Sequence, residues 1–262
     1  MQHVNKKRLK KFYEEEAKHL SHQEAMYLKG NRHELWWHRK RLYYVISFLS
    51  EIFEKNQIIT FAEIGCAEGF YVKYIAPVHN ETFCIDADIA RAYIKKARRN
   101  SKALNTEYVV CDVENLPFKD NSIDVVLCSE VLEHVYNYRD SLAELYRVGK
   151  KHVVISFPGH SYLYKAISKI RLLKKFADNL VRAPDVGHVS EVKITDIQEF
   201  LKGKCKSLKF KIGGALPLQL VKFIPSIGLV EVIDNMICKV LEHFGAVDYA
   251  TIHVIEITKN RN

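Results

Sequence analysis

Between residues 58 and 157 the chain alternates short apolar runs with stretches of helical character. The apolar runs lie at residues 58–64, 82–85, 108–111, 123–128 and 152–157. The helical stretches cover residues 69–77, 89–103 and 130–148. Strands that alternate with helices form βαβ units, which build a mostly parallel sheet with helices on both faces. Ligands bind such a sheet at the carboxyl ends of its strands, so functional residues are expected there.

Further helices are expected on both sides of this alternating segment. Amphipathic patterns before residue 57 predict an N-terminal helical cap over residues 1–56 and a main domain over residues 57–262. A basic amphipathic stretch follows the fifth apolar run, and we interpret residues 159–187 as a substrate lid. Residues 215–244 are apolar but interrupted by prolines, and they predict a helical insert.

The first predicted strand ends in a glycine-containing turn, Glu63-Ile64-Gly65-Cys66-Ala67-Glu68-Gly69. Glycines at a strand-to-helix turn let the backbone approach a ligand and aim helix N-terminal amides at it. The second predicted strand carries Asp86 some 20 residues on, in the run Phe83-Cys84-Ile85-Asp86-Ala87-Asp88. A carboxylate at such a strand end can accept hydrogen bonds from both hydroxyls of a ribose.

Two more segments follow in order. The first comprises Cys111-Asp112-Val113, Leu116-Pro117-Phe118 and Ser122-Ile123-Asp124-Val125-Val126. The second is Ser129-Glu130-Val131-Leu132-Glu133-His134-Val135, at the mouth of the fourth predicted strand. Four linked segments with consistent spacing are far more specific than any one of them.

Together these segments resemble the class I S-adenosylmethionine (SAM) dependent methyltransferases, especially their type 11 small-molecule group. The resemblance implies a Rossmann-like, seven-stranded, mostly parallel sheet whose final hairpin is reversed. The apolar runs at 208–212 and 251–257 suit that hairpin. N-terminal helices and a helical insert after the fifth strand would be added to this fold. The sequence departs from the family pattern at Ala67, where glycine is usual, and at Asp88, where many relatives have serine.

The resemblance also implies which residues hold SAM. The implied set is Glu63, Gly65, Cys66, Ala67, Gly69, Asp86, Ala87, Asp112, Val113 and Ser129. Glu63 and Gly65 would shape the pocket for the amino-acid end, and Asp86 would bind the ribose hydroxyls. Asp112 would accept the adenine amine, and Ser129 would lie near the reacting sulfonium.

His134 and His188 are the candidate catalytic residues. The spacing Glu130-x-x-Glu133-His134, with His188 at a distance, resembles a divalent-metal site in two methyltransferase groups, which make ubiquinone precursors or modify the terminal ribose hydroxyl of small RNAs. A metal bound by Glu130, Glu133, His134 and His188 would lower the pKa of an acceptor hydroxyl. The string is also widespread in metal-free relatives. We therefore favour a metal-free site in which a histidine is the general base.

The tryptophan pair Trp36-Trp37 stands beside Arg39 and Arg41 in the second predicted helix. One interpretation is a helix over the SAM pocket that brings an arginine to a carboxylate or phosphate. The other is an amphipathic helix that packs its aromatic side chains on the sheet.

Charge and composition leave the acceptor open. The net charge of +9 comes from the flanks, with +5 over residues 1–60, −2 over 61–156 and +6 over 157–262. Basic flanks favour an acidic acceptor, an anionic membrane surface or a nucleic acid, and a solvated lysine-rich surface is the alternative. We predict methyl transfer to an oxygen of a small or lipid-linked acceptor. The alternatives are an RNA methyltransferase, acting on a terminal ribose hydroxyl or on tRNA, and a non-catalytic SAM-binding partner subunit.

The expected location is cytoplasmic, with peripheral membrane contact as an open alternative. No apolar run reaches the roughly 18 residues of a membrane-spanning helix. The basic N-terminus is not followed by an apolar stretch, so we expect no signal peptide. None of the six cysteines forms a C-x-x-C pair, which favours reduced thiols.

Overall fold

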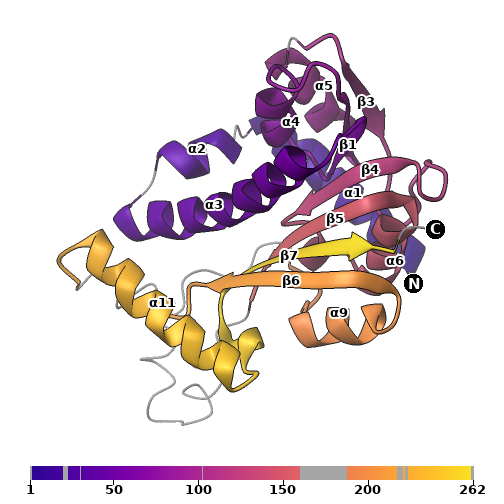
Figure 1. Cartoon of the computed structure of the whole chain (residues 1–262). Helices are drawn as coiled ribbons and strands as arrows, with labels where there is room; N and C mark the ends of the chain where they lie inside the picture. Colours follow the sequence, from indigo (N-terminus) through magenta and orange to yellow (C-terminus); the bar gives the residue numbers. More distant parts are fainter. Residues whose placement is uncertain are drawn as a thin grey trace.

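In a computed structural model, seven strands form a single sheet (Figure 1). The structure describes residues 2–19, 23–29, 31–101, 103–159, 188–216, 221 and 224–260. The strands are β1 (Thr60–Ile64), β2 (Phe83–Asp88), β3 (Thr106–Val110), β4 (Ile123–Ser129), β5 (Gly149–Pro158), β6 (Cys205–Gly213) and β7 (Ile252–Lys259). Their order is β3-β2-β1-β4-β5-β7-β6, and among these strands β7 alone runs opposite to the other six. The predicted fold class and the reversed final hairpin are confirmed.

Helices precede the sheet and connect its strands. Before β1 come α1 (Gln2–His19), α2 (Gln23–Leu28) and α3 (Arg32–Lys55). The later helices are α4 (Phe70–Ile75), α5 (Arg91–Asn100), α6 (Tyr138–Val148), α9 (Ile194–Leu201) and α11 (Ile227–His243), with 3-10 turns η1 (Leu132–His134) and η2 (Val247–Tyr249). Helix α3 begins with a capping box, because the side chain of Asn31 accepts from the Glu34 amide and the Glu34 side chain accepts from the Asn31 amide.

Both faces of the sheet are buried, which explains the nearly continuous apolar strands. Successive side chains of a strand point to opposite faces. Phe61 and Val125 accordingly face α3, where they meet Phe48 and other apolar residues. The alternate residues, such as Val126, lie in a second cluster with α6 and α9. Helix α3 thus belongs to the main core, while the proposed division into a cap (1–56) and a main domain (57–262) stays a prediction.

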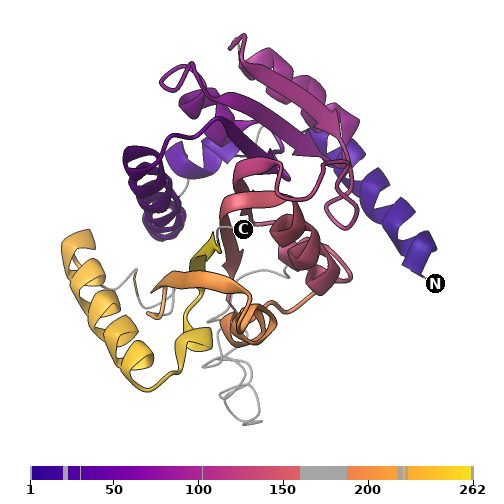
Figure 2. The same ribbon diagram turned by 45° about the vertical axis from the view of Figure 1, so that its right-hand side comes forward.

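Helix α11 is joined to α3 by a buried ion pair. The Nζ of Lys40 lies 2.7 Å from Oδ2 of Asp234 and 2.9 Å from Oε1 of Glu231. Asp234 also accepts hydrogen bonds from the amides of Gly214 and Leu216, at 3.0 and 2.8 Å. These contacts offset the free-energy cost of removing both charges from water, which would be large for an unpaired buried charge. Figure 2 shows α11 beside α3 and far from α1.

Two of the segments that the sequence predicts to be helical, 130–148 and 215–244, lie wholly or partly within the described residues. The predicted helix over 130–148 is wrong in its first part, because residues 132–134 form a 3-10 turn and α6 begins only at Tyr138. In the predicted insert at 215–244, the described residues include α11. Residues 160–187 of the predicted lid lie outside the described part of the chain. No helix among the described residues is both long and apolar enough to cross a bilayer.

Candidate active site

The carboxyl ends of β1, β2 and β4 open into a cavity of about 390 Å³. This is the point where the strand order reverses, because β2 and β4 lie on either side of β1. Ten of the residues predicted from the sequence line it: Gly65, Ala67, Ala87, Asp112, Val113, Ser129, Glu130, Glu133, His134 and His188. Four others, Glu63, Cys66, Gly69 and Asp86, do not belong to its lining.

The turn after β1 is shaped by two residues of the glycine-containing motif. The buried carboxylate of Glu63 accepts hydrogen bonds from the amides of Tyr71 and Val72, at 3.0 and 3.1 Å, and so holds the start of α4. Gly65 has a φ of +73°, and a Cβ there would lie 2.2 Å from a methyl carbon of Val131. Glu63 therefore acts on the pocket through the backbone, and Gly65 lets that backbone form the cavity wall.

Ala67 occupies the left-handed region that the family usually fills with glycine, with a φ of +44°. A left-handed residue other than glycine costs roughly 1–2 kcal/mol. Its amide donates to Oδ2 of Asp88 at 3.0 Å, which fixes this conformation. The substitution of alanine for glycine thus preserves the shape of the turn.

The structure places Asp88 in the cavity lining and leaves the predicted ribose anchor, Asp86, outside it, so we propose Asp88 as the anchor. Asp86 is fully buried beneath the turn, and a Cβ on Gly69 would lie 2.6 Å from its Oδ2. Asp88 is the last residue of β2 and lines the cavity. The side chains of Asp86 and Asp88 point to the same face of β2. Only Asp88 lies at the carboxyl end of the strand, where the cavity opens. Asp88 Oδ1 also accepts from the Ala90 amide at 2.8 Å, so its carboxylate is held in place.

The buried Asp86 predicts a pH-dependent stability. Burial, together with the charge of Asp88, raises the pKa of Asp86 to about 7, against about 4 in an unfolded chain. A raised folded pKa stabilises the protein below pH 4, and this contribution is lost as the pH rises through 7. We expect D86N to remove a decline of a few kcal/mol in the free energy of unfolding between pH 5 and pH 8. Urea unfolding of both proteins at the two pH values measures it, and parallel pH dependences would contradict it.

Helix α1 covers the cavity at the β2–β3 side, which no sequence motif predicted. Lys6 pairs with Asp112 at 3.3 Å and with Glu114. At the other end of α1, the side chain of Glu14 accepts from the first amides of α5, at 2.7 and 3.0 Å. Tyr13 and other α1 residues line the cavity. The sequence signalled only a charged amphipathic helix here, because docking of a helix leaves no local motif.

The end of β4 is held by a network that includes α3. Glu130 has a φ of +58°, and its Oε1 accepts from Ser156 at 3.0 Å. Its Oε2 accepts from Nη1 of Arg41 at 2.6 Å. Ser129 lies 2.8 Å from Ser156, oxygen to oxygen. Both carboxylate oxygens of Glu130 are therefore engaged, and among the described residues only the other three predicted ligands, Glu133, His134 and His188, lie close enough together to hold a metal.

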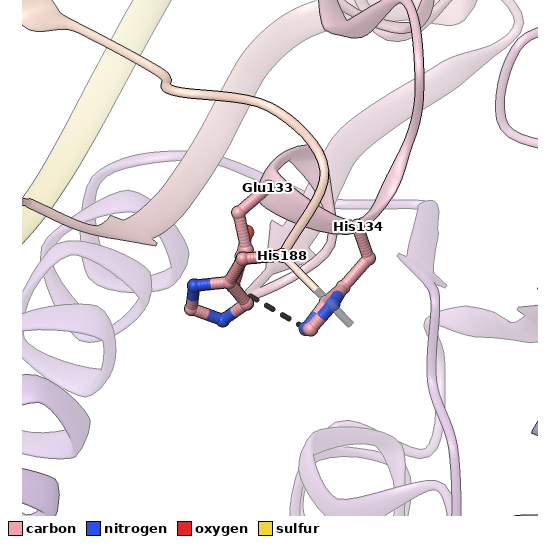
Figure 3. A group of neighbouring side chains, drawn as sticks. All are labelled: Glu133, His134 and His188. Atoms are coloured by element: carbon pink, nitrogen blue, oxygen red, sulfur yellow. Dashed lines mark ion pairs between the residues drawn. The ribbon is translucent and has the colours of Figure 1, made fainter. Parts of the chain in front are cut away.

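Glu133, His134 and His188 do come together (Figure 3). The rings of His134 and His188 meet edge to face with centroids 4.8 Å apart, and Nε2 of His134 lies 3.7 Å from Oε1 of Glu133. One candidate ligand atom from each residue lies within 4.8 Å of the others. The loop that carries His188 is tied to η1, because the amides of Val189 and Ser190 donate to the Glu133 carbonyl at 2.8 and 3.1 Å. Two imidazoles thus meet on one wall of the cavity.

Comparison with known proteins gives a match over the central segment. Residues 62–157 match the family model described as a methyltransferase domain. Phthiotriol/phenolphthiotriol dimycocerosates methyltransferase 1 of Mycobacterium ulcerans is 29% identical over 122 residues, which are 47% of this chain and 42% of that protein. Norajmaline N-methyltransferase of Rauvolfia serpentina is 30% identical over 130 residues, which are 45% and 44% of the two chains. The chain spans less than half the length of these curated relatives.

A solved structure agrees over nearly the whole chain. Magnesium protoporphyrin IX methyltransferase from Synechocystis PCC 6803, solved with bound S-adenosylhomocysteine (SAH), has a TM-score of 0.59 at 12% identity. The alignment covers 97% of this chain and 99% of that one, and at this identity it shows the fold. Residues 62–157 are therefore a methyltransferase domain, and the fold around them is that of the SAM-dependent methyltransferases that the sequence resembles.

Proposed function

We propose that the chain transfers a methyl group from SAM to an oxygen of a small or lipid-linked acceptor. The observation that carries this proposal is the meeting of His134 and His188 in the cavity whose other wall contains Asp88 and Asp112. In this assignment Asp88 accepts from the ribose hydroxyls and Asp112 lies at the adenine. The sulfonium then faces the two imidazoles.

The chemistry requires little of the protein beyond alignment and a proton acceptor. A lone pair of the acceptor oxygen forms a bond to the methyl carbon while the carbon–sulfur bond breaks, and its electron pair stays on sulfur to give SAH. The hydroxyl proton passes to an unprotonated nitrogen of His134 or His188. Holding the reactants in line contributes several kcal/mol, and general base catalysis contributes roughly 10²–10⁴-fold. A hydroxyl acceptor explains why two imidazoles would stand at this wall.

A metal-assisted mechanism would have fewer protein ligands for the metal than the sequence indicated. Glu133, His134 and His188 could hold a divalent ion, whereas Glu130 is bonded to Arg41 and Ser156. Two imidazoles and one carboxylate suit Mn²⁺ or Zn²⁺ better than Mg²⁺. Such an ion would lower the pKa of the acceptor hydroxyl. We favour the metal-free mechanism, because one of the four predicted ligands is engaged elsewhere.

A lipid-linked acceptor at an anionic bilayer surface is supported by the outer side of α11. Apolar side chains that are 44–76% exposed follow this side and the residue after the helix: Leu229, Val232, Met236, Val240 and Phe244. Continuous exposed apolar surface of this kind marks an interaction site. The cations Arg32, bonded to the carbonyl before α11, and Lys239 lie near the stripe and suit anionic headgroups. The M. ulcerans relative is named for phthiotriol and phenolphthiotriol dimycocerosates, which is consistent with a lipid acceptor.

A labelled-methyl experiment tests the acceptor class. The purified chain is incubated with methyl-labelled SAM and a cell extract, which is then separated into organic, aqueous small-molecule and RNA fractions. We expect label in the organic fraction, or in the aqueous small molecules for a soluble acceptor, with SAH as co-product. Label in RNA would instead favour the RNA methyltransferase, and no SAH formation would favour a non-catalytic SAM-binding subunit.

Bilayer contact is tested separately by M236E. A carboxylate in the middle of the exposed stripe should reduce sedimentation with vesicles of anionic lipid at least several-fold, because the stripe can no longer enter the interface. The matched control is M236L, which keeps an apolar side chain of similar size at the same position. SAM affinity should stay unchanged in both variants. Equal sedimentation of M236E and the unmodified chain would remove the membrane proposal and leave SAM-dependent transfer intact.

A further inference from the structure

Helix α1 brings two aromatic rings to the cavity beside the two histidines. Phe12 and Tyr13 both line the cavity, as do His134 and His188. The rings of Tyr13 and His134 meet edge to face, with centroids 5.8 Å apart and 80° between the ring planes. Phe12 meets Tyr13 in the same way at 5.2 Å, and His134 meets His188 at 4.8 Å (Figure 3). Four rings from three separate segments therefore form one chain of contacts, which we call the aromatic wall.

Apolar side chains extend the surface that the aromatic wall begins. Val131 and Val135 stand directly before and after η1, which carries His134, and both line the cavity. The described lining also includes the apolar side chains of Leu9 and Met26. A flat ring that enters such a site gains offset or edge-to-face contacts in addition to the burial of its apolar surface. A saturated group of the same size would gain the burial alone.

The cavity is acidic, although the chain as a whole is basic. Its described lining includes two cations, Lys6 and Arg41, and each is already paired with carboxylates of the same lining. SAM carries a sulfonium and an ammonium against one carboxylate, so it adds one net positive charge. An anionic acceptor would therefore still be repelled. The lining acids are Glu16, Asp88, Asp112, Glu114, Glu130 and Glu133.

The exposed cations of the neighbouring helices lie outside this lining. They are Lys7, Arg8, Lys10 and Lys11 on α1, with Arg91, Lys95, Arg98 and Arg99 on α5. The net charge of +9 therefore does not indicate the charge of the group that enters the cavity. The basic surface acts outside the cavity, and the cavity itself disfavours anions.

We infer that the aromatic wall is the acceptor subsite and that it takes a flat, uncharged, hydroxylated ring. This inference rests on the proposed function, which supplies the transfer of a methyl group to oxygen. The ring lies against Tyr13 with its hydroxyl toward His134 and His188, and the surrounding carboxylates disfavour a carboxylate or phosphate on the ring. Tyr13 is thus a specificity-determining residue for the acceptor, supplied by a helix that precedes the sheet.

The experiment compares three small probes that differ in charge or in aromatic character. Ligand-observed NMR titration gives their affinities for the SAH-saturated chain at neutral pH. The probes are para-ethylphenol, para-hydroxyphenylacetate, in which a carboxylate replaces the terminal methyl group, and para-ethylcyclohexanol, in which the ring is saturated. We expect para-ethylphenol to bind roughly tenfold or more tightly than the anionic probe, because like charges repel. It should bind roughly 2–10-fold more tightly than the saturated probe, as one aromatic contact implies.

Variants assign the aromatic preference to Tyr13. Y13L should reduce the preference for para-ethylphenol over the saturated probe to less than about twofold, because the leucine keeps apolar volume without a ring. Y13F should retain the preference, since the ring remains. The matched control is Y43L, at an exposed tyrosine of α3 outside the cavity lining. SAH affinity within about threefold of the unmodified chain shows that the cavity is intact in each variant.

A second pair of variants tests the charge of the lining. E16Q removes one lining carboxylate, and its amide oxygen can still accept the hydrogen bond from Tyr93. It should raise the affinity for para-hydroxyphenylacetate several-fold and leave that for para-ethylphenol unchanged. E15Q removes the same charge from an exposed neighbour outside the lining and should change neither affinity.

The unmodified chain decides the inference even if a variant fails to fold. Binding of the anionic or the saturated probe as tightly as para-ethylphenol would overturn it. So would an aromatic preference that survives in Y13L, equal effects of E16Q and E15Q, or the failure of all three probes to bind a chain that binds SAH. Failure of the unmodified chain to bind SAH is a different result, which refutes the proposed function itself.

Discussion

Replacement of Asp88 by alanine is expected to weaken SAM binding by about 100-fold or more. Two charge-assisted hydrogen bonds to the ribose hydroxyls would be lost, each worth roughly 1.5–3 kcal/mol. The carboxylate also holds the amides of Ala67 and Ala90. Its removal therefore loosens the turn that forms the cavity wall. Calorimetric titration with SAM and with SAH measures the effect.

Two comparisons separate ligand contact from general damage. D88N keeps the size of the side chain but can accept from only one of the amides of Ala67 and Ala90, so its thermal unfolding is measured beside its weakened SAM affinity. D86N should keep SAM affinity within about threefold, because Asp86 lies beneath the cavity and not in its lining. A large loss in D86N with little loss in D88A would return the ribose contact to Asp86.

The position of Asp88 also predicts how SAM affinity depends on pH. Burial raises the pKa of Asp88 to about 6 in the ligand-free protein. Only the ionised carboxylate can accept from both ribose hydroxyls through the lone pairs left free by the backbone amides. SAM affinity should therefore fall as the pH drops below about 6, in contrast to the stability contribution of Asp86, which is lost as the pH rises.

Loss of the two histidines should have the second large effect, on turnover and not on SAM binding. We expect H134Q or H188Q to lower kcat by roughly 10²–10⁴-fold, because the acceptor proton loses its base. The matched control is H243Q, an exposed histidine in the last turn of α11. SAH affinity should be unchanged in all three variants. The measurement is SAH formation with the acceptor identified from the labelled-methyl experiment.

The same assay distinguishes a base from a metal site. With a histidine base, EDTA leaves activity unchanged, and the loss in H134Q and H188Q persists when Mn²⁺ or Zn²⁺ is added. Loss of activity in EDTA with recovery on metal addition would support ligation by Glu133, His134 and His188 instead. Full turnover in H134Q and H188Q would show that alignment alone suffices.

The sequence predicted the strands well because their pattern is local. Each apolar run is buried on both faces, so its composition alone indicates a strand. The choice between Asp86 and Asp88 could not be made in the same way. They are two residues apart and point to the same face of β2. Which of them lies at the carboxyl end of the strand depends on the pairing of β2 with β3, where Asp88 is opposite Val110. Strand ends are set by the neighbouring strand, which the local sequence does not contain.

The prediction for Glu130, Glu133 and His134 failed at one residue for a related reason. Helical spacing would place all three on one turn, but Glu130 takes a positive φ and turns toward Arg41. A partner 89 positions away in the chain decides this conformation. The contribution of α1, through Lys6 and Tyr13, was missed because helix docking depends on tertiary contacts. The two interpretations of the helix that carries Trp36-Trp37 are compatible. Trp37 packs with the core, and Arg41 of the same helix lines the cavity.

A structure with bound SAH tests the central assignment most directly. The account predicts the ribose hydroxyls at Asp88, the adenine beside Asp112 and Val113, and the amino-acid end beside Gly65. The sulfur should face His134 and His188. SAH bound outside this cavity, or a ribose held by Asp86 with Asp88 turned away, would contradict the account.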